Sequence, residues 1–176
     1  AVQTAGIMIG FEKVLLDEKP DLIIVVGDVN STMACSIVAS KLKIKIAHVE
    51  AGLRSFDRIM PEEINRMVTD TLSDFLFVSE ESGLENLKKE GIADSKVFFT
   101  GNIMIDSLVR YLDMINQSNI MAEYQLDKQD YILVTFHRPS NVDSYSDIKS
   151  LGDLLNFLAE KRKIIFPIHP RTLKNI

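Results

Sequence analysis

Six charged side chains lie close together between a predicted strand and the first turn of a predicted helix. The strand is the apolar run 44–49, the helix begins at Pro61, and Gly52 lets the backbone turn between them. Open α/β sheets place their chemistry where a strand leads into a helix, so this stretch is the first candidate for a catalytic site. A solvated surface loop would explain the same charges. The six residues are Glu50, Arg54, Asp57, Arg58, Glu62 and Glu63.

Polar side chains also follow the other predicted strands, at the point where each strand ends. Because the carboxyl ends of parallel strands share one edge of a sheet, we expect Asp28 and Glu50 to face the same crevice. Asp28 could instead cap a turn, and Glu62 and Arg66, four residues apart on one helix, could form a plain ion pair. The residues that follow strands are Asp28, Glu50, Asn102, His137 and His169.

Other chemistries have weaker support in the sequence. A metal site of His48, Glu50 and Glu62 is conceivable, but these residues lack the HExxH spacing of a helical zinc site, so we predict no metal. His48 is better explained as a structural histidine, and Cys35, in a helical run of small residues, as a buried inert thiol. The sequence contains no Walker loop and no GxGxxG or GxSxG motif.

The composition is that of an ordinary globular protein and argues against several functional classes. The chain has 176 residues, of which 46% are hydrophobic and 26% charged. Its net charge of −5 and pI of about 5.2 argue against binding to nucleic acid or acidic membranes. The longest apolar runs are strand-sized and the first residues lack a cationic leader, so we expect no membrane span and no signal peptide. The single cysteine excludes an internal disulfide, and a cytoplasmic location fits best.

Strands and helices alternate along the first part of the chain. Such an order is typical of an α/β fold with a parallel sheet and right-handed crossovers. Apolar runs predict strands at 21–26, 44–49, 75–78 and 96–100. Helical periodicity predicts helices at 2–18, 32–42, 61–72 and 81–90.

The pattern changes after Asn102. A long helical segment and an irregular polar stretch lead to two more strands with one helix between them, at 131–136, 148–161 and 163–168. We therefore predict the C-terminal portion of a first Rossmann-like domain at 1–102, an inter-domain helix and linker at 103–130, and the start of a second Rossmann-like domain at 131–176. Two strands and one helix cannot close such a domain, so we expect a piece of a longer protein.

Four motifs in this order resemble the non-hydrolysing UDP-N-acetylglucosamine 2-epimerase family. The resemblance covers nearly the whole chain, and HVEAGLR followed shortly by MPEEINR is its most specific part. The motifs are VVGDVNST, AHVEAGLRSFDRIMPEEINR, FTGNIMID and VTFHRPSNVD.

The resemblance implies a GT-B-like fold, in which two Rossmann-like domains face a cleft and the second binds the nucleotide. It implies interconversion of UDP-N-acetylglucosamine and UDP-N-acetylmannosamine. In that family the C2 proton is lost, UDP is eliminated to leave a 2-acetamidoglucal, and UDP adds back with C2 protonated on the opposite face. No cofactor is required. We also expect a cytoplasmic homodimer that serves polysaccharide biosynthesis.

The resemblance also implies roles for individual residues. The acidic catalytic positions of the family match Asp28, Glu50 and Glu62, and its histidine near the leaving diphosphate matches His137. Arg138 is a plausible phosphate partner because a guanidinium is a fixed multidentate donor. The substrate-binding candidates are Arg54, Arg66, Asn102, Arg138 and His169.

Two departures and two alternatives accompany this interpretation. Ser140 occupies a position where the family often has glutamate, and the family's terminal Gly-Thr-Arg-Pro-Glu and Ser-Gly-Gly segments are absent from the chain. We therefore expect residues 1–176 alone to be inactive. A hydrolysing 2-epimerase, which releases N-acetylmannosamine and UDP, is one alternative. A non-catalytic nucleotide-sugar sensor on the same fold is the other.

Overall fold

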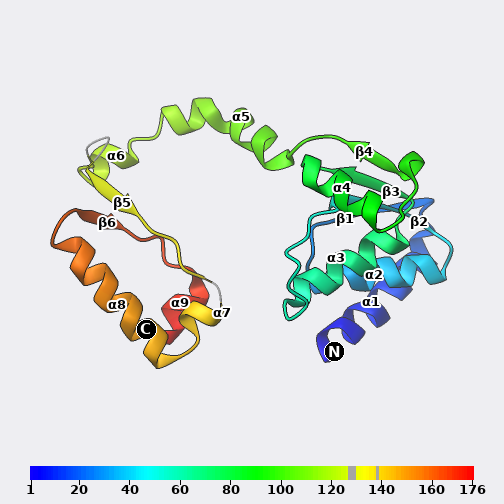
Figure 1. The fold of residues 1–176 in the computed structure, drawn as a ribbon, viewed down its shortest axis with the longest axis horizontal. Helices are drawn as coiled ribbons and strands as arrows, with labels where there is room; N and C mark the ends of the chain where they lie inside the picture. The colour runs from blue at the N-terminus through cyan, green and yellow to red at the C-terminus, as the bar shows by residue number, and fades with distance from the viewer. Residues whose placement is uncertain (127–129, 138) are drawn as a thin grey trace. The chain divides into compact units, whose positions relative to one another are not determined.

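The computed structural model describes residues 1–126, 130–137 and 139–176. It divides into two compact units, Ala1–Tyr111 and Leu112–Ile176, and helix α5 (Ile103–Asn116) contains the boundary between them. Each unit holds one parallel sheet (Figure 1). The domain boundaries expected from the sequence, after residues 102 and 130, remain predictions.

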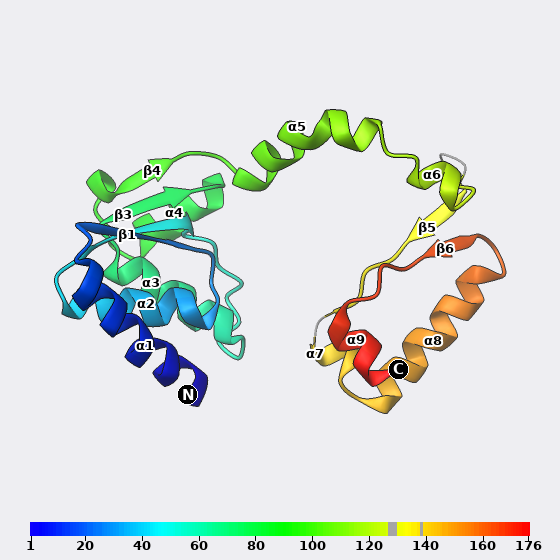
Figure 2. The ribbon, with the colours of Figure 1, turned by 180° about the vertical axis from the view of Figure 1, so that it is seen from behind.

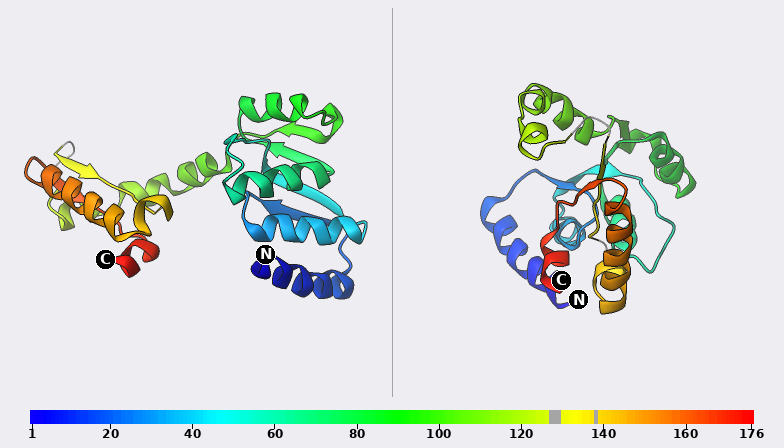
Figure 3. Two further views of the ribbon diagram at one scale, coloured as in Figure 1. Left: turned by 60° about the horizontal axis from the view of Figure 1, so that its bottom comes forward. Right: turned by 90° about the vertical axis from the view of Figure 1, so that its left-hand side faces the viewer.

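The first unit is a four-stranded parallel sheet in the order β1-β2-β3-β4, with a helix after each of its first three strands. These helices cover one face of the sheet, and α1 packs against α2 (Figure 3). The strands are β1 (Leu22–Val26), β2 (Lys45–Ala51), β3 (Phe75–Val78) and β4 (Val97–Phe99). The helices are α1 (Val2–Glu18), α2 (Asn30–Lys41), α3 (Pro61–Leu72) and α4 (Glu81–Lys89), with a 3₁₀ turn at Asp94–Lys96.

The second unit pairs two strands in parallel and places α8 along β6 (Figure 2). Helices α7 and α9 contact each other beyond the carboxyl ends of these strands. The strands are β5 (Tyr131–Leu133) and β6 (Lys163–Ile165). The helices are α6 (Ile120–Glu123), α7 (Pro139–Val142), α8 (Tyr145–Ala159) and α9 (Pro170–Asn175).

The core of the first unit lies between the sheet and its helices. One cluster joins β1, β2 and α2 through Ile23, Val25, Val38 and Ile46, and a second joins β3 to α4 around Leu87. Burial of such side chains is the main favourable term in folding. The sheet therefore holds the carboxyl ends of β1 and β2 side by side.

Strand β1 is apolar along its whole length but is buried on one face only. Ile23 and Val25 are buried, whereas Leu22, Ile24 and Val26 are exposed. The reason is that β1 is the edge strand of this sheet and the helices of the unit lie on one face.

Several element ends also differ from the predictions. Strands β5 and β6 are three residues long, because the ladder between them holds only three pairs of residues. The long helix expected at 103–120 ends at Asn116, and α6 is separate. Helix α2 begins at Asn30, two residues before the predicted start at 32, and has no side-chain cap. Helix α9 was not predicted.

Candidate functional site

The turns after β1 and at the end of β2 lie against each other. The amide of Gly27 donates to Val49 O at 3.0 Å, and a Cβ atom on Gly27 would lie 3.7 Å from Glu50 Oε2. The carboxylate of Glu50 is therefore beside the residue that precedes Asp28. This contact holds the two turns together, and a crevice shared by Asp28 and Glu50 remains a prediction.

Glu50 occupies an unusual backbone position. Its φ is +68°, in the left-handed region that few residues other than glycine adopt, and the register between β2 and β3 shifts between Val49 and Ala51. A bulge of this kind aims a side chain away from the regular alternation of a strand. Gly52 follows with φ +79°, and a Cβ there would lie 2.6 Å from Gly83 O, so only glycine fits.

Helix α3 holds the Asp28 turn through two side chains. Arg66 Nη2 lies 2.6 Å from Asp28 Oδ2, and both side chains are half-buried. Asn65 Nδ2 donates to Asp28 O at 2.9 Å and to Asn30 Oδ1 at 3.1 Å. Among the described ion pairs, Arg66 joins Asp28 and not Glu62, so the plain ion pair considered for Glu62 does not form here.

Glu62 lies at the exposed first turn of the same helix. It lines an open pocket of about 340 Å³ with Val29, Asn30 and Asn65, next to the Asp28 turn. Asp28, Glu50 and Glu62 therefore come from the end of β1, the end of β2 and the start of α3, at one edge of the sheet. Three carboxylates at one edge can serve as general bases and acids for a bound molecule.

Arg54 is turned into the protein. Its side chain is 2% exposed, Nε and Nη2 donate to the two carboxylate oxygens of Glu90 at 2.8 and 2.6 Å, and Nη2 lies 2.7 Å from Asp70 Oδ2. Burial lowers the pKa of this guanidinium, but the hydrogen bonds and charges of Glu90 and Asp70 outweigh it and raise the pKa. This placement argues against direct contact between Arg54 and a substrate and favours a structural role.

His48 and Asp70 form a fully buried pair. His48 Nδ1 lies 2.6 Å from Asp70 Oδ1, and the other ring nitrogen lies 2.9 Å from Gly27 O. This placement agrees with the structural role preferred for His48 from the sequence. No group of three His, Cys, Asp or Glu residues that could hold a metal is found within 1–126, 130–137 and 139–176. Burial raises the pKa of the Cys35 thiol, which disfavours the reactive thiolate.

Sequence reasoning missed the inward face of α3. Glu63, Asn65 and Asp70 are buried there. The signal was available in part, since Glu63, Arg66 and Asp70 recur at helical spacings of three and four.

Glu63 anchors the loop that follows Gly52. Its carboxylate accepts from the amide of Ser55 at 2.7 Å, from the Ser55 hydroxyl at 2.8 Å and from the amide of Phe56 at 3.2 Å. Burial acts to raise the pKa of Glu63, but these hydrogen bonds and the charge of Arg54 hold it below its usual range. The ionised form therefore stabilises the loop.

We predict that Glu63→Gln lowers the free energy of unfolding at pH 7 by about 1–3 kcal/mol, because the amides of Ser55 and Phe56 lose a charged acceptor. Since the folded-state pKa is depressed, this contribution is complete above the ordinary glutamate pKa and is lost as pH falls through the lower folded value. Urea unfolding at neutral and acidic pH measures it.

The matched control for this prediction is Glu62→Gln, the same change at the exposed neighbouring position. We expect it to change the unfolding free energy by less than about 1 kcal/mol at both pH values. The difference in unfolding free energy between the unmodified protein and the Glu63→Gln variant should become smaller in acid. If it does not, the ionised form of Glu63 is not what stabilises the loop.

In the second unit, the structure brings His137 and His169 together. Both follow strands of the small sheet, and their ring centroids are 5.8 Å apart. Both side chains are exposed, and His169 caps α9 by accepting the amide of Arg171 on Nδ1 at 3.1 Å. Thr172 Oγ1 donates to Phe136 O at 2.8 Å and ties α9 to the segment that carries His137.

Two other predicted binding residues have different outcomes. Asn102 Oδ1 accepts the amide of Met104 at 2.9 Å, so Asn102 begins helix α5, and substrate binding by it remains a prediction. Arg138 lies outside the described residues.

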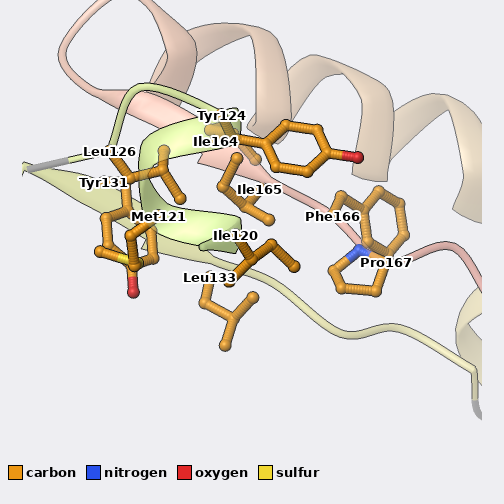
Figure 4. A pocket seen from close by; sticks show the side chains of 10 residues that line it. All are labelled: Ile120, Met121, Tyr124, Leu126, Tyr131, Leu133, Ile164, Ile165, Phe166 and Pro167. Atoms are coloured by element: carbon orange, nitrogen blue, oxygen red, sulfur yellow. The ribbon is translucent and has the colours of Figure 1, made fainter. Parts of the chain in front are cut away.

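An apolar pocket belongs to the second unit. It has a volume of about 600 Å³ and is lined by α6, β5, β6 and the segment after β6 (Figure 4). Its described lining residues include Ile120, Leu133, Ile165 and Phe166, and none of those described is a carboxylate or a histidine, so we do not assign the acid–base site to it. No helix in the described part of the chain is long and apolar enough to cross a membrane.

The fold class expected from the sequence, α/β of GT-B-like type with parallel sheets, is confirmed by both sheets and by solved relatives. A crystal structure of UDP-GlcNAc 2-epimerase from Methanocaldococcus jannaschii, in complex with UDP-GlcNAc and UDP, superposes with a TM-score of 0.86 at 46% identity. The superposition covers 98% of this chain and 49% of that one.

Comparison with known sequences points to the same group of proteins. A UDP-N-acetylglucosamine 2-epimerase homolog of Methanococcus maripaludis is 49% identical over 174 residues, which are 98% of this chain and 48% of the relative. A UDP-2,3-diacetamido-2,3-dideoxy-D-glucuronate 2-epimerase of Pseudomonas aeruginosa is 39% identical over 172 residues, covering 96% of this chain and 48% of the relative. The chain spans about half the length of the curated relatives it matches. The family model for UDP-N-acetylglucosamine 2-epimerase matches residues 1–176, and the chain belongs to this family.

Proposed function

We propose that this chain supplies the acid–base half of an enzyme that interconverts UDP-N-acetylglucosamine and UDP-N-acetylmannosamine. The observation that carries the proposal is the position of Asp28, Glu50 and Glu62, which come after β1, at the end of β2 and in the first turn of α3, in a chain that matches the epimerase family model over residues 1–176. The resemblance to the family implies that these same positions are catalytic.

The reaction needs a base on one face of the sugar and an acid on the other. One carboxylate removes the C2 proton, the C1–O bond breaks with its electron pair going to UDP, and a C1–C2 double bond forms. UDP then attacks C1, and C2 receives a proton on the opposite face. Carboxylates that come from separate elements, as Asp28, Glu50 and Glu62 do, can flank a sugar ring on two sides.

The ion pair between Arg66 and Asp28 orients one of these carboxylates. With Nη2 at 2.6 Å, the guanidinium fixes the Asp28 side chain and keeps a positive charge at the sheet edge. Arg66 is therefore our substrate-binding or orienting residue in the first unit. In the second unit we assign His137, His169 and Arg138 to the diphosphate, because imidazole and guanidinium groups donate to phosphate oxygens.

The product and the fate of the C2 hydrogen test this proposal. In deuterated water, the complete protein should convert UDP-N-acetylglucosamine to UDP-N-acetylmannosamine with one deuterium at C2, because that proton is exchanged through a carboxylate. Proton NMR of the product measures both. Free N-acetylmannosamine would favour the hydrolysing alternative, and binding without deuterium incorporation would favour the sensor.

The P. aeruginosa relative gives a second substrate to compare. Its name specifies a 2-epimerase that acts on a diacetamido glucuronate, and it is 39% identical to this chain against 49% for the M. maripaludis homolog. The higher identity favours UDP-N-acetylglucosamine. Assaying both sugar nucleotides side by side decides between them.

Our proposal also covers the oligomeric state, the cellular location and the biosynthetic role of the enzyme. We infer a cytoplasmic homodimer that makes precursors for polysaccharide biosynthesis, and the single cysteine is compatible with a reducing compartment. Sedimentation of the complete protein tests the dimer. Cell fractionation tests the location.

A further inference from the structure

We propose that the buried His48–Asp70 pair is a positioning device that sets the separation of Asp28 and Glu50. The inference rests on the proposed function, since it concerns how the two carboxylates are held for catalysis. Neither His48 nor Asp70 reaches the sheet edge, because both side chains are fully buried. Their effect is exerted through the backbone of the two turns.

The imidazole of His48 bridges two acceptors. Nδ1 lies 2.6 Å from Asp70 Oδ1 and Nε2 lies 2.9 Å from Gly27 O. A carbonyl oxygen can only accept, and so can an ionised carboxylate, a form that the contact of Asp70 with Arg54 favours, so we infer that both ring nitrogens donate and that the ring is positively charged. Asp70 neutralises this charge, as a buried ion requires.

The second carboxylate oxygen of Asp70 binds the turn that follows β2. Oδ2 accepts the amide of Gly52 at 3.1 Å and the Nη2 group of Arg54 at 2.7 Å. A carboxylate that accepts from His48, Gly52 and Arg54 has little freedom to move. Asp70 therefore ties Gly52 to the ring that holds Gly27.

The two tethered residues flank the predicted catalytic carboxylates. Gly27 directly precedes Asp28, and Gly52 comes two residues after Glu50. Glu50 has φ +68°, a backbone strain that persists only where the surrounding structure fixes the chain on both sides. His48 on one side and the Gly52 amide on the other supply these fixed points.

Two isosteric variants separate the two ends of the bridge. The amide nitrogen of asparagine lies as many bonds from Cβ as Nδ1, so His48→Asn keeps the donor to Asp70 and loses the donor to Gly27 O. The amide nitrogen of glutamine matches Nε2, so His48→Gln keeps the donor to Gly27 and loses the donor to Asp70.

We expect each variant to lower kcat of the complete protein by about 10- to 100-fold, because displacing a reacting group by about 1 Å has effects of this size. KM should stay within about threefold, since neither residue touches the substrate. Val38→Ala is the control, because it weakens the core cluster between α2 and the sheet without touching either turn. It should lower the melting temperature but leave kcat within about threefold.

A double-mutant cycle shows whether the effect passes through the carboxylates. In a protein that already carries Glu50→Gln, His48→Asn should lower kcat further by less than about threefold, because groups that act as a unit are not additive. A full 10- to 100-fold loss in that background would overturn the proposal. So would normal kcat in both single variants.

A measurement without substrate keeps this inference separate from the proposed function. In the unmodified protein, nitrogen-15 NMR should show both ring nitrogens of His48 protonated, and the Gly52 amide should be protected from exchange. Asp70→Asn should remove that protection. A neutral His48 ring or an unprotected Gly52 amide would overturn this inference. If both ring nitrogens are protonated and the Gly52 amide is protected but the complete protein shows no epimerisation, only the proposed function is overturned.

Discussion

Replacing Glu50 by glutamine is expected to lower kcat for epimerisation by about 10²–10⁴-fold, the range for loss of a general acid or base. We expect Asp28→Asn and Glu62→Gln to have effects in the same range. Each amide keeps the shape of the side chain but cannot accept a proton from C2 or return one to it. The measurement is steady-state turnover of the complete protein with UDP-N-acetylglucosamine.

Solvent deuterium exchange at C2 refines this prediction. A variant that lacks the base should lose exchange and turnover together, whereas a variant that lacks only the acid on the other face can still exchange the substrate proton. Glu12→Gln is a suitable control because Glu12 is exposed on α1, away from the sheet edge. Near-normal turnover in all three amide variants would show that the assignment is wrong.

The arrangement of strands was predictable because local patterns and tertiary packing agree in this chain. Runs such as Leu22–Val26 and Phe75–Val78 are apolar and strand-sized, and each is followed by a helix, α2 and α4 respectively. With parallel strands and short crossovers, few topologies remain. The position of Asp28 beside Glu50 follows from that topology alone.

The partners of the charged residues could not be read from the sequence. Arg54 was a substrate-binding candidate, yet its partners are Asp70 and Glu90, which are 16 and 36 residues away in sequence. Arg66 was weighed as a partner of Glu62 but binds Asp28, which is on another element. Spacing along a helix identifies neighbours on its surface, whereas contacts across elements depend on the packed fold.

The backbone at Glu50 was also outside the reach of sequence patterns. A left-handed conformation is expected at glycine, and Gly27 and Gly52 do adopt it. Nothing in the residue type of Glu50 predicts the same conformation, because its cause is the surrounding hydrogen bonds and the shift of register against β3. Such positions occur where the structure holds a functional group in place.

His137→Asn should lower kcat by more than it raises KM. His137 follows the first strand of the second unit, and its ring lies 5.8 Å from that of His169. A departing diphosphate gains negative charge as the C1–O bond breaks, so a donor aimed at it acts mainly in the transition state. A histidine can also deliver a proton near neutral pH. Steady-state kinetics over a range of UDP-N-acetylglucosamine concentrations separates kcat from KM.

His169→Asn provides the matched comparison, because it makes the same chemical change at the neighbouring ring. An asparagine at this position can still cap α9, since its side-chain oxygen can accept the Arg171 amide that His169 Nδ1 accepts now. We expect this variant to raise KM more than it lowers kcat, as for a residue that binds substrate and transition state alike. If His137→Asn shows the same pattern as His169→Asn, His137 serves ground-state binding and has no role in the departure of UDP.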